Sequence, residues 1–412
     1  MQYQNDMKNL EEEQLPEPSQ DEFALSADLA FEIVSEIREK GPMPFSRFFD
    51  LALYHPTKGY YTGPQAVFGR DGDFITAPLI SDLFSRSIAN QIIEIQSLMQ
   101  NHPEIEILEI GAGNGTMARD ILVALKNAGK LPKRYMILEV SPNLIERQRA
   151  LIAESLPEYI DQVVWINEPP QSAWKGVILA NEVLDALTVE RFRIVDSKPC
   201  YVDVGLEVNE ADKTVRLAPT LRDADAKLQA FYDELLEKGY QLLEGTETEY
   251  CPAVETWLPP LFEHLEEGVA LFIDYGYDEK EYYRPERTTG TLIAHYKHRA
   301  HEDFYLYPGL QDLTANVNFT QVATVLVDMG LEFIGYTAQA YFLMGNKLQE
   351  MVASDKAEFT DENDIRWFEL SKQVQHLVHP EEMGERFKVL AVGKNFEEAL
   401  QGFELYDYAH HL

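Results

Sequence analysis

A glycine-rich loop is the feature of this 412-residue sequence that most directly indicates chemistry. It follows an apolar run at 107–110 and precedes a segment at 117–125 whose apolar residues recur at helical spacing, so it joins a buried strand to a helix. Such a loop places backbone N–H groups and a helix N-terminus against a nucleotide. The glycines of the loop are Gly111, Gly113 and Gly115.

The spacing of these glycines and one acidic neighbour narrow the kind of ligand. Dinucleotide-binding loops have the pattern G-x-G-x-x-G and hold a diphosphate, whereas this loop has the pattern G-x-G-x-G and Glu109 lies two residues before its first glycine. A carboxylate repels a diphosphate and attracts an ammonium group. We therefore expect Glu109 and the three glycines to cradle the methionine end of S-adenosylmethionine, an adenosine compound with an amino-acid tail and no phosphate. The alternative is a tight turn without a ligand.

A second acidic residue, Glu139, closes the next apolar run at 135–138. A carboxylate accepts two hydrogen bonds and so matches the two hydroxyls of a ribose. Glu139 is therefore predicted to bind the ribose of the cofactor. The alternative is a carboxylate that caps the helix expected from Pro142 onward.

Three polar residues, Asn181, Glu182 and Asp185, follow the fourth expected strand at 176–180. Doubly wound sheets bind their ligands at the carboxyl ends of the strands, so we expect these side chains to face the group that is modified. Paired carboxylates bind a guanidinium in bidentate fashion, and Asn181 is expected to bond the cofactor or the acceptor. For each acid alone, the alternative is an N-cap or a favourable charge in the first turn of a helix.

Asp274 ends the fifth expected strand, at 269–273, and adds a further candidate acid at the same edge. Tyr275 is a candidate wall of the pocket, and a structural role is the alternative for both residues. The sequence contains no Asn/Asp-Pro-Pro-Tyr/Phe motif, the signature of methylation on amide or adenine nitrogen, which disfavours those two acceptors.

A basic segment at 294–303 carries His295, His298 and His301. No cysteine or fixed histidine pair accompanies them in the spacing of a zinc site. We therefore predict no metal site and expect an ordered loop near the substrate pocket.

Composition excludes several classes of partner. Acidic residues outnumber basic ones 70 to 35, which gives a formal net charge of −35 and disfavours nucleic acid and anionic membranes. No apolar run is long enough to span a membrane. The two cysteines, Cys200 and Cys251, lie in no metal or redox spacing, so a reduced, cytoplasmic protein without disulfides is expected. The acidic surface suits a cationic peptide, and solubility is the plainer explanation for it.

Strand and helix signals alternate from residue 107 onward and predict an α/β fold with a Rossmann-like, doubly wound sheet. We expect seven strands, the last of them, at 387–392, antiparallel and at the edge. Ser26 is expected to begin the first helix and Gly41 to end it. A hairpin is expected at 201–217 and a helical segment at 221–245.

The expected organisation has four regions. A helical and loop extension covers the active site of a cofactor-binding domain, and a tail stands at each end. The regions are 1–24 (disordered acidic tail), 25–100 (extension), 101–395 (domain, with insertions at about 195–262, 276–318 and 339–384) and 396–412 (tail).

The chain resembles the MidA-like methyltransferases, some of which act in the assembly of mitochondrial complex I. The resemblance runs from about Gly41 to Lys394, and its motifs lie at 51–61, 68–78, 107–117, 138–142, 180–187, 273–277, 290–292, 308–315 and 383–390. It implies a class I methyltransferase fold and S-adenosylmethionine as cofactor. It also implies that Gly69, Asp73 and Thr76 fold over the cofactor pocket.

For the mitochondrial members, the same resemblance implies symmetric dimethylation of an arginine in a complex I subunit. The acidic N-terminal segment lacks the arginines of a mitochondrial presequence, which suggests a bacterial, cytoplasmic relative. The leading prediction is a protein arginine methyltransferase that acts on a protein with an exposed arginine. The alternatives are a methyltransferase for a small molecule or another protein side chain, and a cofactor-binding assembly factor with little turnover.

Overall fold

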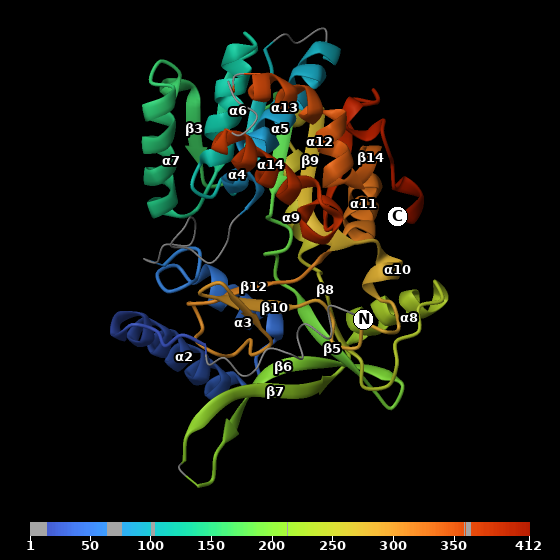
Figure 1. Ribbon diagram of the computed structural model, residues 1–412. Coiled ribbons are helices and arrows are strands. Elements are labelled where there is room, and N and C mark those ends of the chain that lie inside the picture. Colours follow the sequence, from blue (N-terminus) through green and yellow to red (C-terminus); the bar gives the residue numbers. More distant parts are fainter. Residues whose placement is uncertain (1–14, 64–75, 100–103, 212, 358, 360–363) are drawn as a thin grey trace.

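The computed structural model describes residues 15–63, 76–99, 104–211, 213–357, 359 and 364–412, and the statements below concern these residues. The chain forms an α/β lobe around a large sheet and a second lobe below it, built from N-terminal helices and two small sheets (Figure 1). No helix of the described residues is long and apolar enough to cross a membrane.

The large sheet has seven strands on one path. From edge to edge they are β14 (Glu332–Ala338), β15 (Phe387–Lys394), β9 (Leu265–Tyr277), β4 (Trp174–Asn181), β1 (Glu106–Ile110), β2 (Arg134–Leu138) and β3 (Val163–Ile166). The five strands from β9 to β3 run parallel, and short β13 (Val317–Asn318) pairs with the end of β9. The predicted α/β class is confirmed. β15 is antiparallel as expected, but β14 pairs with its outer side, so β15 does not lie at the edge.

Helices cover both faces of this sheet, because strands buried on both sides need apolar partners on each. One face packs against α5 (Asp82–Leu98), α6 (Thr116–Asn127), α7 (Pro142–Ser155), α12 (Gln339–Gly345), α13 (Leu348–Ala357) and α14 (Ile365–Val378). The other face packs against α9 (Val254–Phe262) and α11 (Phe319–Asp328). The remaining short helices are α4 (Ala77–Ile80) and α10 (Glu279–Tyr282).

The second lobe is assembled from the N-terminal helices and from the segments that follow β4 and β9. Its core joins α2 (Gln20–Lys40) and α3 (Phe45–Tyr54) to residues of the two small sheets. The four-stranded sheet consists of β7 (Val215–Asp223), β6 (Lys198–Val208), β5 (Glu190–Val195) and β8 (Glu247–Tyr250), flanked by α8 (Ala226–Glu237). The three-stranded sheet consists of β11 (Arg299–His301), β10 (Ile293–Tyr296) and β12 (Asp312–Thr314).

Two sequence-based boundaries are wrong. Helix α2 begins at Gln20 and not after Ser26, because Ser19 and Glu22 form a capping box in which each side chain accepts the other residue's backbone N–H. Residues 20–24 therefore belong to a helix, whereas most of the predicted tail, 1–14, lies outside the described residues. Residues 221–223 continue strand β7, since they pair with 200–202, and α8 begins after the N-cap Asp225. The predicted end of α2 at Gly41 is confirmed.

The capping box gives a stability prediction. Replacing Ser19 with Ala removes the acceptor for the Glu22 N–H and is expected to lower the free energy of unfolding by about 1 kcal/mol. Urea denaturation measures this change. An unchanged midpoint would show that the first turn of α2 does not depend on the cap.

Candidate active site

The carboxyl ends of β1, β2, β4 and β9 meet at the edge of the large sheet that faces the second lobe (Figure 1). The glycine loop follows β1, Glu139 follows β2, the 181–185 turn follows β4, and Asp274 lies near the end of β9. The structure thus brings the predicted residues of four separate motifs to one sheet edge.

All three glycines of the loop adopt the left-handed backbone region. Their φ angles are 63° at Gly111, 53° at Gly113 and 88° at Gly115. A Cβ on Gly115 would lie 3.0 Å from Cα of Gln148, a residue of the neighbouring helix α7. The loop therefore needs glycine for its backbone conformation and for close packing of α6 on α7.

Glu109 is fully buried at the end of β1. The Tyr135 hydroxyl donates to its Oε2 at 2.7 Å, and Oε1 has no hydrogen-bond partner among the described residues. Burial raises the pKa of Glu109 to about 7, against the lowering effect of the Tyr135 bond, and the charge of Glu139 raises it further. A buried acceptor of this kind suits a cationic donor such as an ammonium group.

Glu139 binds the backbone that leads into α7 and a side chain of that helix. Its Oε1 accepts the N–H groups of Val140 and Ser141, each at 2.9 Å, and its Oε2 accepts Nε2 of Gln148 at 3.0 Å. The same amide nitrogen donates to the Gly113 carbonyl at 2.8 Å, so Gln148 links Glu139 to the glycine loop. Sequence reasoning missed Gln148, because only the packing of α7 brings it there.

The turn after β4 holds two acids, of which Asp185 is buried and Glu182 is half-buried. Glu182 adopts a φ of 52°, a strained value for a residue with a side chain. Asn181 Nδ2 donates to Glu182 Oε1 at 3.2 Å, while Asn181 Oδ1 and Asp185 Oδ1 are buried and have no hydrogen-bond partner among the described residues. Burial raises the pKa of Asp185 to about 6, and burial together with the charge of Asp185 raises that of Glu182 to about 8.

Asp274 holds this turn in place. Its Oδ2 accepts the N–H groups of Val183, Leu184 and Asp185 at 3.1, 2.9 and 3.2 Å, and its Oδ1 accepts that of Tyr275 at 2.9 Å. These contacts match the structural alternative for Asp274 and make it a positioning residue. The Tyr275 hydroxyl donates to Asp185 Oδ2 at 2.6 Å, so Tyr275 lies beside the 181–185 turn.

The residues implied by resemblance alone are only partly visible. Gly69 and Asp73 lie outside the described residues. Thr76 is the N-cap of α4, and the backbone N–H of the next residue, Ala77, lies within hydrogen-bonding reach of Glu182. Thr76 therefore adjoins the 181–185 turn.

The three histidines belong to a strand pair in place of the expected loop. His295 lies in β10, His298 in the turn and His301 in β11. Burial lowers the pKa of His295 to about 4 and also lowers that of His301. Within the described part of the chain, no group of three or more His, Cys, Asp or Glu side chains could hold a metal ion.

Three residues of the second lobe reach the same site and were not predicted. They are Tyr54, whose hydroxyl donates to the Ala186 carbonyl at 2.9 Å, and the hydrogen-bonded pair Tyr61 and Asp312. All three lie in motifs that carry the family resemblance, and that was the available signal.

The strand order and the glycine loop at the sheet edge define a class I methyltransferase. The family model described as S-adenosyl-L-methionine-dependent methyltransferase matches residues 87–337. A Burkholderia thailandensis protein solved with bound S-adenosyl-homocysteine is 34% identical, with a TM-score of 0.87 over 97% of this chain and all of its own. The chain belongs to this family of S-adenosylmethionine-dependent methyltransferases.

Named relatives occur in animals. A mitochondrial protein from Drosophila melanogaster, named protein arginine methyltransferase NDUFAF7 homolog, is 28% identical over 92% of this chain and 87% of its own length. The Homo sapiens protein arginine methyltransferase NDUFAF7 is 28% identical over 87% of this chain and 82% of its own.

Proposed function

We propose that the chain transfers the methyl group of S-adenosylmethionine to a guanidinium nitrogen of an arginine in a protein substrate. The observation that carries the proposal is the 181–185 turn, where the buried carboxylate of Asp185, the half-buried carboxylate of Glu182 and an amide oxygen of Asn181 gather at the sheet edge. Asn181 Oδ1 and Asp185 Oδ1, for which the described residues supply no donor, accept hydrogen bonds only. This group of acceptors is complementary to a cation rich in N–H donors, and the names of the animal relatives support arginine.

The residues after β1 and β2 fit the cofactor. The buried Oε1 of Glu109 suits the ammonium group in the methionine part of the cofactor. The left-handed glycines let the backbone of the loop approach the cofactor closely. Val140, beside Glu139, is 60% exposed and offers an apolar surface for the adenine. When bound, the cofactor supplies an electrophilic methyl group on its sulfonium.

The acids of the 181–185 turn have separate roles in this proposal. Asp185 Oδ1 accepts the guanidinium N–H groups and orients one nitrogen for in-line attack, and positioning of this kind supplies much of the rate. As the bond from the attacking nitrogen to the methyl carbon forms, the carbon–sulfur bond would break with its electron pair left on sulfur, which gives S-adenosylhomocysteine, and the nitrogen releases a proton. The Glu182 carboxylate takes that proton, and its pKa of about 8 makes it a matched base near neutral pH.

The raised pKa of Glu109 makes cofactor binding depend on pH. A carboxyl with a pKa near 7 is mostly ionised at pH 8 and mostly protonated at pH 6, and protonation removes the charge that holds the ammonium. Affinity for S-adenosylhomocysteine is expected to fall about tenfold from pH 8 to pH 6, in proportion to the ionised fraction. Calorimetry at several pH values, with Glu109→Gln as the control, measures this. Equal pH profiles for the two proteins would contradict the role of Glu109.

Labelling with tritiated S-adenosylmethionine tests the function. The chain is incubated with extract from a strain that lacks it, and the labelled protein is hydrolysed to amino acids. The proposal predicts label in methylated arginine. Label in another amino acid or in the small-molecule fraction would contradict it and identify a different acceptor class.

A further inference from the structure

The N-terminal extension and the insertion at 276–318, which are far apart in the sequence, meet beside the 181–185 turn. The Tyr61 hydroxyl, just after α3, donates to both carboxylate oxygens of Asp312 in β12, at 3.0 and 3.1 Å. Asp312 is 3% exposed. A buried carboxylate is thus held in a fixed orientation by a residue of another element.

The Tyr61 ring also stacks on Tyr54, which connects this pair to the site. The two ring centroids are 5.7 Å apart and the planes are inclined by 27°. Tyr54 bonds the Ala186 carbonyl, and the Ala315 N–H, just after β12, donates to the Asp185 carbonyl at 3.1 Å. Both α3 and β12 are therefore fastened to the turn that carries Asp185.

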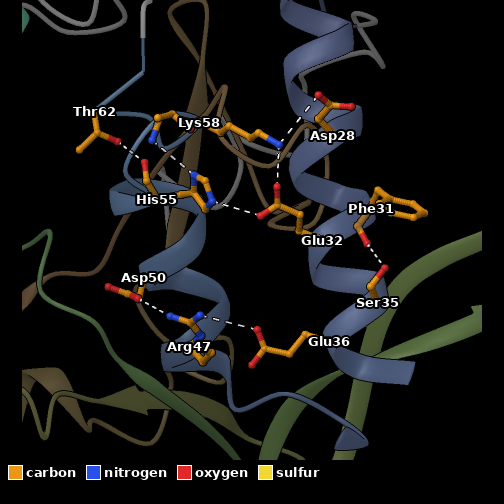
Figure 2. Close-up of polar contacts among 11 residues, drawn as sticks. Asp28, Phe31, Glu32, Ser35, Glu36, Arg47, Asp50, His55, Lys58 and Thr62 are labelled. Atoms are coloured by element: carbon orange, nitrogen blue, oxygen red, sulfur yellow. Dashed lines mark hydrogen bonds and ion pairs between the residues drawn. The ribbon is translucent and has the colours of Figure 1, made fainter. Parts of the chain in front are cut away.

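The segment that carries Tyr61 is itself rigid. Its backbone folds back on α3 through a hydrogen bond from Tyr61 N to the Leu53 carbonyl, at 3.0 Å. A Cβ on Gly59 would lie 2.5 Å from that same carbonyl oxygen, so the turn that brings residues 59–61 back to α3 has no room for a side chain at position 59. Figure 2 shows how the turn is tied to α2, where Lys58 and His55 both contact the Glu32 carboxylate, at 2.7 and 3.1 Å.

The carboxylates of Asp312 and Asp185 lie close enough to Tyr54 and Tyr61 to change the pKa of both hydroxyls. Burial, and then the charges of Asp312 and Asp185, raise the pKa of Tyr54 and of Tyr61 well above 10. Both tyrosines therefore stay neutral and keep the hydroxyl protons that they donate. The site combines neutral, stacked aromatic rings with two nearby carboxylates.

We infer that Asp312 is a second carboxylate that binds the guanidinium of the acceptor, with Tyr61 as the positioning residue that orients it. This inference rests on the proposed arginine acceptor. A guanidinium is planar, presents its N–H donors at its edge and stacks on aromatic faces, so it suits carboxylates beside a tyrosine pair. An ammonium group has no such plane and gains less binding free energy from the aromatic rings. The site is therefore expected to select arginine over lysine.

The test compares Asp312→Asn and Tyr61→Phe with wild type in the tritium assay, at a series of extract concentrations. The control is Glu302→Gln, which removes an exposed carboxylate from the same insertion. The half-saturating extract concentration is expected to rise about tenfold for Asp312→Asn and about threefold for Tyr61→Phe. Glu302→Gln is expected to match wild type. Affinity for S-adenosylhomocysteine and melting temperature report whether each variant is folded.

Small cations give a second readout. Ethylguanidinium is expected to inhibit the wild-type reaction at much lower concentration than ethylammonium, and Asp312→Asn is expected to reduce this difference. If wild type labels arginine but Asp312→Asn keeps the wild-type half-saturation and the same cation preference, the inference fails and the proposed function stands. If wild type labels no arginine, both fail. Should Asp312→Asn lose cofactor binding, Tyr61→Phe decides, and an unchanged half-saturation for it would overturn the inference.

Discussion

The Asp185→Asn protein is expected to bind S-adenosylhomocysteine with an affinity within about twofold of wild type and to transfer methyl groups at least about 100-fold more slowly. Asn removes the negative charge but keeps the size of the side chain, so the backbone of the turn, held by Asp274, stays in place. Loss of one partner of a buried charged pair costs about 3 kcal/mol or more, which is about 100-fold. Single-turnover transfer and calorimetry measure the two quantities separately.

The matched control for this change is Asp161→Asn, because Asp161 is exposed and lies just before β3, away from the carboxyl ends of the strands. It is expected to leave both quantities unchanged. The same split, retained cofactor affinity with lost transfer, is expected for Glu182→Ala, since the base that takes the proton is removed. Transfer at the wild-type rate by either Asp185→Asn or Glu182→Ala would remove that residue from the acceptor site.

The second large effect concerns the glycine loop. Gly113→Val is expected to abolish detectable binding of S-adenosylhomocysteine, at least about 100-fold, because Gly113 has a φ of 53° that a β-branched residue adopts only with strain. The loop would have to change its backbone conformation, and with it the surface that faces the cofactor. Calorimetry on the folded variant measures the loss.

Gly129 provides a control, because its backbone also has a positive φ angle. Gly129, at the far end of α6, has a φ of 66°, and an added Cβ there would meet nothing within 4 Å. Gly129→Val is therefore expected to lower stability but to leave binding of S-adenosylhomocysteine within about twofold. If both valine variants bind equally well, the glycine loop does not contact the cofactor.

The features predictable from sequence are those with a local physical signal. The expected strands at 135–138 and 176–180 lie within β2 and β4, and the glycines of the loop at 111–115 adopt left-handed φ angles, which glycine permits. Gly41 ends α2 as its C-cap, as expected. Buried strands, caps and positive φ angles each depend on a few neighbouring residues, so a short stretch of sequence is enough to predict them.

The features that escaped prediction depend on contacts between distant segments. The sequence places Asp274 at the right edge, but only the structure shows that its two oxygens accept four backbone N–H groups. Gln148 has no local pattern that distinguishes it, and the resemblance motifs that contain Tyr61 and Asp312 do not show that these two residues meet. Their positions depend on how α7, the α3 turn and β12 pack, and no periodicity within one element encodes that arrangement.

The central claim is transfer to arginine through the acids of the 181–185 turn. The most direct test is amino-acid analysis of tritium-labelled extract protein prepared in parallel with wild type and with Asp185→Asn. Label is expected in methylated arginine from wild type alone, with symmetric dimethylarginine as the end product that the family resemblance implies. Equal label from both proteins, or label from wild type that co-elutes with any other amino acid, would contradict it.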